Sequence, residues 1–223
     1  LLSVADLAGR AYAVQVVDKR AYVASGAAGL QVIDVTAADQ PRLIGGAHVG
    51  NATNLRVVDS LAYVVGWDDT LRIVDVTSPS SPYVIGSVSG LSSAFAVDVQ
   101  GDMAFVADRA QGLKIIDVSM PSAPSIIGGF DAENGASDVD VSGSLAYLAT
   151  PSGLHVLDVS EPATPRAVGR FAVPSGDWFA WSVRVFGSLA YVGMGRTEPF
   201  GAGEVGSMAV LDVAAPSSPR LMG

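Results

Sequence analysis

The sequence predicts an all-β chain of the β-propeller class, with five four-stranded antiparallel blades. Two recurring features carry this prediction. The word Ala-Tyr-Val, or a close variant, occurs five times at intervals of about forty residues or more, beginning at Ala21, Ala62, Ala104, Ala146 and Ala190. Each is followed by an aspartate that has a proline seven residues later; these are Asp34, Asp75, Asp117, Asp158 and Asp212. A repeat of this period is typical of a modular architecture.

The third copy shows how each strand is recognised. Residues 96–99 alternate apolar and polar side chains, which favours a strand, and a tight turn follows at 100–102. A second strand is expected at 103–107, and a third at 113–118, where β-branched residues are frequent. A turn with two prolines then leads to a fourth strand at 125–130.

Four short strands joined by hairpin-length loops form a small antiparallel sheet. One such sheet cannot bury both of its faces alone. Several sheets arranged radially can do so, because each packs on its neighbours, which favours a propeller with one repeat per blade. A β-helix is the competing interpretation, but its coils usually repeat with a much shorter period.

The chain is expected to form one domain over residues 1–223, with repeats of about 42 residues and an insertion at 196–206 in the fifth. Residues 1–4 resemble the fourth strand of a repeat, and residues 219–223 open another. The N-terminal segment is therefore expected to supply the outer strand of the last blade and to close a five-bladed ring. The alternative is a fragment of a larger propeller.

The third strand of each repeat carries a recognisable motif, Leu113-Lys114-Ile115-Ile116-Asp117-Val118 in the third copy, followed by the proline turn. This motif resembles that of the LVIVD-repeat family of bacterial propellers, and the resemblance covers essentially the whole chain. It implies a secreted, periplasmic or surface-attached bacterial protein. It implies the architecture strongly and the function only weakly.

Composition excludes several classes of partner. The formal net charge is -9, and the sequence contains only two lysines, Lys19 and Lys114. Binding of nucleic acid through its phosphates is therefore not expected. No apolar run reaches the length of about 18 residues needed to cross a bilayer, so membrane insertion is not expected either. Cysteine is absent, which excludes disulfides and thiolate metal sites.

The five repeated aspartates, Asp34, Asp75, Asp117, Asp158 and Asp212, suggest either a scaffold or a ring of metal ligands. Each ends a third strand and precedes a turn, so its carboxylate can accept backbone N–H bonds there. We interpret all five as structural. The two histidines, His48 and His155, show no sign of converging, and no metal or other cofactor is predicted.

The fifth copy departs from the others in two loops, and binding residues concentrate on such loops. One loop, at 173–181, enters the first strand, and the other, at 196–206, joins the second and third strands. Both lie at the same end of a four-stranded meander, as does the loop holding Trp67. The candidate binding residues are Trp67, Asp177, Trp178, Trp181, Arg196, Glu198, Phe200 and Glu204. The alternative is that the tryptophans only plug the channel or pack under the insertion.

The innermost strands carry a polar residue between two apolar ones, at Gln15, Arg56, Asp98, Asp140 and Arg184. Neighbouring blades are expected to pair Arg56 with Asp98 and Asp140 with Arg184. A charged substrate channel is the alternative.

No sequence motif of a catalytic or nucleotide site is present. The sequence therefore favours a noncatalytic binding or scaffolding module of an extracytoplasmic protein, with a protein, peptide or glycan as partner. One alternative is an enzyme acting on a glycan through carboxylates among Asp177, Glu198 and Glu204. A further alternative is a structural spacer with no ligand.

Overall fold

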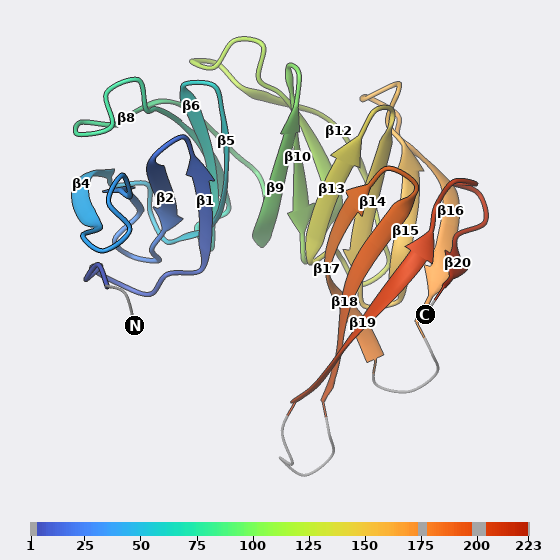
Figure 1. Cartoon of the computed structure of the whole chain (residues 1–223). Helices are drawn as coiled ribbons and strands as arrows, with labels where there is room; N and C mark the ends of the chain where they lie inside the picture. Colours follow the sequence, from blue (N-terminus) through green and yellow to red (C-terminus); the bar gives the residue numbers. More distant parts are fainter. Residues whose placement is uncertain (1–3, 174–177, 198–203, 223) are drawn as a thin grey trace. The chain divides into compact units, whose positions relative to one another are not determined.

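The computed structural model describes residues 4–173, 178–197 and 204–222. All regular secondary structure in these residues is β-strand, arranged in five four-stranded antiparallel sheets (Figure 1). The strands of every sheet follow one another in chain order, as in a meander. This confirms the predicted fold class. The described residues form no helix that is long and apolar enough to cross a membrane.

Each sheet corresponds to one repeat of the sequence. The first contains β1 (Ala13–Val17), β2 (Arg20–Ala24), β3 (Leu30–Asp34) and β4 (Arg42–Ala47). The second contains β5 (Ala52–Val58), β6 (Leu61–Gly66), β7 (Thr70–Asp75) and β8 (Tyr83–Ser89). The third contains β9 (Ala94–Gln100), β10 (Met103–Asp108), β11 (Gly112–Asp117) and β12 (Ser125–Phe130). The fourth contains β13 (Asp138–Ser142), β14 (Leu145–Thr150), β15 (Gly153–Asp158) and β16 (Arg166–Ala172). The fifth contains β17 (Trp178–Phe186), β18 (Leu189–Thr197), β19 (Glu204–Asp212) and β20 (Arg220–Leu221).

The chain divides into two compact units. The first comprises residues 1–104 and 117–125, and the second comprises residues 105–116 and 126–223. The single-domain organisation expected from the unbroken repeat stays a prediction. In the third repeat, the strands predicted from sequence agree with β9 to β12 to within two residues at every boundary.

The fifth sheet differs from the sequence prediction in two places. Residues 178–181 were expected in a loop, but they form the beginning of β17. Residues 196–206 were also expected in a loop, yet β18 continues to Thr197 and β19 begins at Glu204. The insertion therefore lengthens a hairpin, which extends past the other strands of its unit (Figure 1). Backbone hydrogen bonding across the hairpin explains why strand prevails over loop here.

The N-terminal segment is described from Val4 onward. Within the described residues, the outer strand of the fifth sheet is β20, and Val4 lies in no strand. Ala5 and Leu7 instead pack against a buried cluster of the first sheet formed by Ala21, Val23 and Ile33. Residues 1–3 lie outside the described part of the chain, and closure of a ring stays a prediction.

Successive sheets pack through two different faces. The front face of a sheet carries the aromatic residue of its second strand, such as Tyr22 in the first sheet. The rear face carries the two apolar residues of the innermost strand, such as Leu55 and Val57 in the second sheet. The front of the first sheet and the rear of the second share one buried cluster. The fourth and fifth sheets share an equivalent cluster.

The aromatic residues of the repeated word are therefore packing residues in the first four sheets. Tyr22, Tyr63, Phe105 and Tyr147 are all buried. Burial raises the pKa of the phenol group in each of the three tyrosines, because the charged phenolate would lose its hydration.

Polar side chains link the innermost strands of neighbouring sheets. The side-chain amide of Gln15 makes two hydrogen bonds to the backbone of Val57. Its oxygen accepts the Val57 N–H at 2.7 Å, and its nitrogen donates to the Val57 carbonyl at 3.0 Å. Arg56 forms the predicted ion pair with Asp98, at 3.1 Å. These side chains thus fix one sheet against the next in the first unit.

The link between the fourth and fifth sheets uses a residue that the sequence analysis did not select. The carboxylate of Asp138 accepts bonds from Arg184 at 2.9 Å and from the N–H of Val183 at 3.0 Å. Asp140, the predicted partner of Arg184, accepts the N–H of Val185 at 2.9 Å. Burial raises the pKa of the Asp138 carboxyl, and the positive charge of Arg184 opposes this effect.

A second contact between repeats lies at the outer strands. In each of the first four sheets, a glycine of the fourth strand lies so close to the proline turn of the next repeat that an added Cβ would collide with the proline carbonyl oxygen. The pairs are Gly45 with Pro79, Gly86 with Pro121, Gly128 with Pro162, and Gly169 with Pro216. Only glycine permits this approach of two backbones.

The five repeated aspartates make the same bond. In each case Oδ1 accepts the backbone N–H of the second residue along the chain, at 2.8 or 2.9 Å. The donors are Thr36, Thr77, Ser119, Ser160 and Ala214. Bonds from the backbone and the hydroxyl of these donors lower the carboxyl pKa of Asp34, Asp75, Asp117 and Asp158. Their contribution to stability stays a prediction.

We expect Gly128→Ala to lower the free energy of unfolding by about 1–3 kcal/mol, because the new methyl group forces two backbones apart. Thermal unfolding measures the change. Gly206→Ala is the control, since its Cβ would meet only the Met194 carbonyl oxygen, at 4.0 Å. Equal melting temperatures for the two variants would contradict the proposed role of the contact.

We expect the turn aspartates to make the fold sensitive to acid. The carboxyl pKa of these aspartates is lower in the folded state than in the unfolded state, where it is about 4. The carboxylate therefore stabilises the fold at pH values above the unfolded pKa. This contribution is lost as the pH falls through the folded-state pKa. Asparagine keeps the acceptor oxygen but cannot titrate. Asp75→Asn should therefore flatten the decline of Tm below about pH 4, and the combined variant of Asp34, Asp75, Asp117 and Asp158 should flatten it further.

Asp131→Asn is the control for this experiment, because it removes the same charge from an exposed loop. If Tm falls equally for the wild type and the combined variant as the pH drops below about 4, these bonds do not stabilise the folded state.

Candidate functional site

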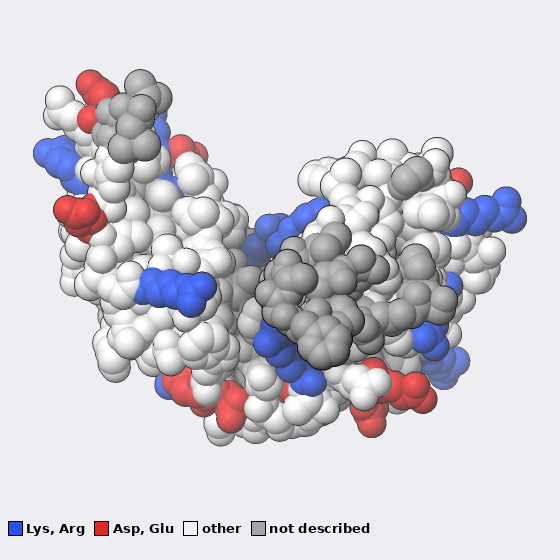
Figure 2. All heavy atoms as spheres, turned by 90° about the horizontal axis from the view of Figure 1, so that it is seen from below, with Lys and Arg blue, Asp and Glu red and all other residues white. Residues whose placement is uncertain are grey.

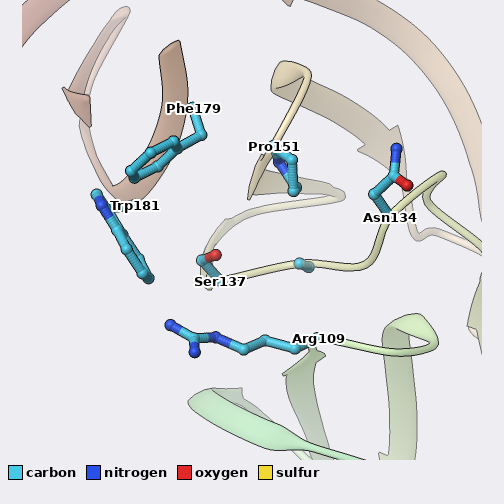
Figure 3. A pocket seen from close by; sticks show the side chains of 7 residues that line it. Arg109, Asn134, Ser137, Pro151, Phe179 and Trp181 are labelled. Carbon is cyan, nitrogen blue, oxygen red and sulfur yellow. The ribbon is translucent and has the colours of Figure 1, made fainter. Parts of the chain in front are cut away.

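An aromatic pocket of about 370 Å³ lies in the second unit, at the ends of three successive sheets. We call it the Trp181 pocket. It is lined by Arg109, Asn134, Ala136, Ser137, Pro151, Phe179 and Trp181 (Figure 3). These residues come from loops that either enter a first strand or join a second strand to a third, and from the beginning of β17. A meander places all such loops at one end of its sheets.

Two aromatic rings form one wall of the pocket. Trp181 is the extra residue of a β-bulge, because the pairing of β17 with β18 shifts between Ala180 and Ser182. A bulge changes the direction of a side chain, and bulges are frequent beside functional sites. The rings of Phe179 and Trp181 meet edge to face, with centroids 4.9 Å apart. Trp181 is 39% exposed, so part of its surface remains accessible to solvent.

The neighbouring strand leaves room for these rings. Gly195 lies opposite Phe179 in β18. A Cβ at this position would lie 3.0 Å from Cδ1 and Nε1 of Trp181 and 3.1 Å from Cε2 of Phe179. Glycine at 195 therefore allows the two side chains to lie against the strand.

Arg109 supplies a positive charge to the pocket. Its side chain points toward the indole (Figure 3), and its guanidinium carbon lies 4.9 Å from the ring centroid of Trp181. This is the geometry of a cation–π interaction. Burial lowers the pKa of Arg109. An arginine nevertheless keeps its proton, and with five N–H donors it can contact the ring and bind an acceptor group at once.

The loop that carries Arg109 is held by a buried carboxylate. Oδ1 of Asp108 accepts the N–H groups of Ala110 and Gln111 at 2.8 and 2.9 Å. The backbone carbonyl of Asp108 accepts the N–H of Ala136 at 2.9 Å, which joins this loop to the one that enters the fourth sheet. The floor of the pocket is thus built from two loops bonded to each other.

The second loop is also fixed to its own sheet. Ser137 donates its N–H to the carbonyl of Ala149 at 2.8 Å. Gly135 has a positive φ of 76° and lies against the backbone of Arg109, where a side chain would collide. Asn134 and Ser137 therefore belong to a loop of the floor whose backbone is held in place. A pocket built in this way can hold a ligand with a flat apolar face and a few hydrogen-bonding groups.

Five segments of the sequence match the LVIVD repeat family, at residues 8–46, 49–89, 92–132, 135–173 and 200–223. The chain belongs to the LVIVD repeat family. Residues 174–199 lie outside these matches, and this stretch contains Phe179 and Trp181. The aromatic wall of the pocket therefore lies where the fifth repeat departs from the family pattern.

No curated protein matches the chain. Among solved structures, the computationally designed Ika8 protein is similar, with a TM-score of 0.69, 10% identity, and coverage of 92% of this chain and 59% of that chain. The N-terminal domain of Nup159 has a TM-score of 0.64 and 9% identity, covering 96% and 61%. A functionally unknown protein from Desulfotomaculum acetoxidans has a TM-score of 0.67 and 9% identity, covering 97% and 86%.

At these identities the likeness shows the fold alone, which is that of a repeat β-propeller. The LVIVD repeat chain spans about three fifths of the length of Ika8 and of the Nup159 domain.

The structure places the predicted binding residues in different parts of the LVIVD repeat chain. Trp181 lines the pocket. Trp178 begins β17, half-buried, and pairs through its backbone with Arg196 in β18. Glu204 begins β19. The side chains of Arg196 and Glu204 lie outside the described structure, as do Asp177, Glu198 and Phe200 entirely.

Trp67 belongs to the first unit, where its ring meets Tyr12 edge to face with centroids 5.2 Å apart. Its role as an outlying contact of the same site stays a prediction. So does the binding role of the other residues named from the sequence.

The sequence analysis did not select Arg109, Ser137 or Pro151. The sequence nevertheless contained a signal for them. The sequence analysis placed every loop that enters a first strand, and every loop that joins a second strand to a third, at one end of the sheets. Applied to the third and fourth repeats as well as the fifth, this rule would have selected the loops of Arg109, Asn134 and Pro151. Searching only where repeats differ in length missed them.

We expect Gly195→Ala to disturb the aromatic wall without changing any aromatic residue. The added methyl group must displace the indole of Trp181 or the ring of Phe179, since both lie closer than ordinary van der Waals contact. Near-ultraviolet circular dichroism and tryptophan emission should both change. Gly206→Ala is the matched control, because Gly206 lies directly opposite Gly195 in the same hairpin. Identical spectra for the two variants would contradict the arrangement of the wall.

Proposed function

We propose that this LVIVD repeat protein is a noncatalytic binding module that holds its ligand in the Trp181 pocket. The observation that carries the proposal is the combination of two aromatic rings with a cationic side chain in one preformed pocket. Aromatic residues and arginine are the side chains that most often dominate binding energy. The segments that match the family then act as the scaffold that positions this wall.

The chemistry of the lining favours a compact neutral or singly charged ligand. Trp181 and Phe179 offer aromatic surface for a sugar ring or an apolar peptide side chain. Arg109, Asn134 and Ser137 supply hydrogen bonds that orient the ligand. A glycan or a peptide segment satisfies both requirements.

Charge argues against nucleic acid as the partner. The chain has a formal net charge of -9. Figure 2 shows Lys and Arg side chains scattered over the face in view rather than gathered into one basic patch. A polyanion would be repelled at long range. An extracytoplasmic setting in a bacterium is part of the same proposal, and it rests on the family resemblance.

The alternative of a glycan-cleaving enzyme has no observation in its favour. Its candidate carboxylates are Asp177, Glu198 and Glu204, whose side chains lie outside the described structure. Among the described residues that line the pocket, none is a carboxylate or a histidine. Glycoside hydrolysis usually needs a pair of carboxyl groups on either side of the scissile bond.

A binding screen tests the proposal directly. The chain is screened against arrays of glycans and peptides, and the best ligand is titrated into variants. We expect Trp181→Ala to weaken binding by about 10- to 100-fold, because truncation of a central aromatic anchor typically costs this much. Arg109→Gln should weaken it as well. The melting temperature should change little, since the indole is partly exposed.

Phe186→Ala is the matched control, because Phe186 is an exposed aromatic residue on the same strand that does not line the pocket. Full binding by Trp181→Ala would contradict the proposed site. Cleavage of a glycan by the wild-type chain would contradict the noncatalytic function and favour the enzyme alternative.

A further inference from the structure

A second group of aromatic and cationic side chains lies in the first unit. Tyr12 directly precedes β1, Trp67 directly follows β6, and their rings meet edge to face with centroids 5.2 Å apart. The guanidinium carbon of Arg10 lies 5.2 Å from the ring centroid of Tyr12, in the geometry of a cation–π interaction. We call these three residues the Trp67 cluster. Trp67 is 49% exposed and Tyr12 is 37% exposed, so part of each residue is accessible to solvent.

The cluster occupies the same positions of the repeat as three residues of the Trp181 pocket. Two of these positions lie three and five residues before the polar residue of an innermost strand. The third lies five residues after the first alanine of the repeated word. The equivalent pairs are Tyr12 with Trp181, Arg10 with Phe179, and Trp67 with Arg109. The side chains are exchanged between positions, but each group combines two aromatic rings with one arginine.

The backbone beneath the cluster is fixed by hydrogen bonds between loops. Gly26 and Ala52 exchange two bonds, at 2.9 and 3.0 Å, which join the loop after β2 to the beginning of β5. Trp67 donates its N–H to the carbonyl of Asn51 at 3.2 Å. A ligand can therefore bind without first ordering these loops, which lowers the cost of binding.

A glycine leaves room for the phenol ring. Gly26 has a positive φ of 54°, and a Cβ there would lie 3.2 Å from Cε2 of Tyr12 and 3.4 Å from Oδ1 of Asn51. The ring thus lies against the backbone, as the indole of Trp181 does at Gly195. The same glycine places the Asn51 amide on the other side of this narrow space.

An ion pair stands in the same loop as Trp67. Nη1 of Arg72 lies 2.6 Å from Oδ2 of Asp68, the residue that follows Trp67 in the chain. Arg72 also donates to the carbonyl of Val49 at 3.0 Å, which fixes its side chain. Both members of the pair are partly exposed. A carboxylate accepts hydrogen bonds and a guanidinium donates them, so both kinds of polar group are present beside the cluster.

The cluster lies at the loop ends of its sheets. Sheets of this chain pack on one another through their faces. Access to the cluster is therefore a separate matter from what packs on the faces of the first sheet. All the residues of the cluster, and the polar groups beside it, belong to the first unit.

We propose that the Trp67 cluster is a second binding site, which takes a pyranose ring of a neutral glycan. A pyranose has an apolar C–H face, which packs on an aromatic ring, and a rim of hydroxyl groups that both donate and accept hydrogen bonds. Trp67 and Tyr12 supply the aromatic surface. Asn51, Asp68 and Arg72 supply donors and acceptors for the rim, whereas an apolar peptide side chain would use none of them.

The glycan is neutral because charge opposes a polyanion. Asp68 and Arg72 balance each other, and the chain as a whole has a formal net charge of -9. The site is separate from the Trp181 pocket, and it does not depend on the function proposed for that pocket.

The experiment follows the three tryptophans of the chain separately. Isotope labelling of the indole nitrogen gives one NMR signal for each, and replacement of each tryptophan by phenylalanine assigns the signals. The probes are soluble cello-, manno- and chito-oligosaccharides at millimolar concentration, with decaproline as the peptide probe. We expect at least one of the oligosaccharides to shift the signal of Trp67. The same shift should occur in Trp181→Ala, because Trp181 belongs to the other unit.

Two variants alter the cluster and keep Trp67 as the reporter. Tyr12→Ala should weaken the binding measured at Trp67 by about 10-fold, because it removes one of the two rings. Arg10→Gln removes the cation from the face of Tyr12 and should also weaken it. Both residues are exposed, so both variants should fold, which circular dichroism verifies. Tyr83→Ala is the matched control, since Tyr83 is an exposed tyrosine of β8 in the same unit, and it should bind like the wild type.

Absence of a shift at Trp67 with every oligosaccharide would overturn the proposal. So would a shift caused by decaproline alone, or unchanged affinity in Tyr12→Ala and Arg10→Gln. If Tyr12→Ala unfolds, Arg10→Gln alone decides. Failure of the Trp181 pocket is a different result, because it is recorded at the Trp181 signal and leaves the outcome at Trp67 as it stands.

Discussion

The close approach of backbone to backbone between successive repeats sets the spacing of the sheets at their outer strands. At four positions a glycine of one fourth strand lies directly against the proline turn of the next repeat. Glycine contributes no side chain to this contact. The distance between the two repeats is therefore set by the closest approach of their backbones. The proline turn can hold its part of the contact because it is rigid.

A different kind of contact holds the inner strands. There the links are polar and directional, and they join a side chain of one sheet to the backbone or the side chain of the next. Apolar packing fills the space between these two rows of contacts. Two neighbouring sheets are thus fixed at both their innermost and their outermost strands, and the hydrophobic core between them has little freedom to slide. Loops that extend from such a pair are held at defined positions.

The Trp181 pocket depends on this rigidity. Its wall belongs to the fifth sheet, its floor to loops of the third and fourth repeats, and the guanidinium of Arg109 to the loop held by Asp108. The buried Asp138 ties the fourth sheet to the fifth immediately beside Ser137. Local departures from the repeat, namely the bulge at Trp181 and the glycine at 195, then direct the aromatic rings into the pocket.

The fold could be predicted from the sequence because its information is periodic and local. The alternation at 96–99 and the word Ala-Tyr-Val identify strands without reference to any other part of the chain. The pocket could be predicted only in part. Trp181 departs from the repeat and could be noticed, whereas Arg109 lies in a loop of ordinary length. The strands at 178–181 and 204–206 were missed because pairing across a long hairpin, rather than residue preference, makes them strands.

The turn aspartates have a bearing on how such a chain arises. Each carboxylate bonds to a residue only two positions further along, so donor and acceptor are always encoded within one short stretch of the gene. A duplication that copies the stretch copies a complete turn, ready to fold in its new place. Contacts such as Asp138 with Arg184 span two repeats, and each has to be matched again by mutation after a copy is inserted. Bonds within a turn can therefore be inherited unchanged by every repeat. Contacts between repeats become specific to one pair of neighbouring sheets.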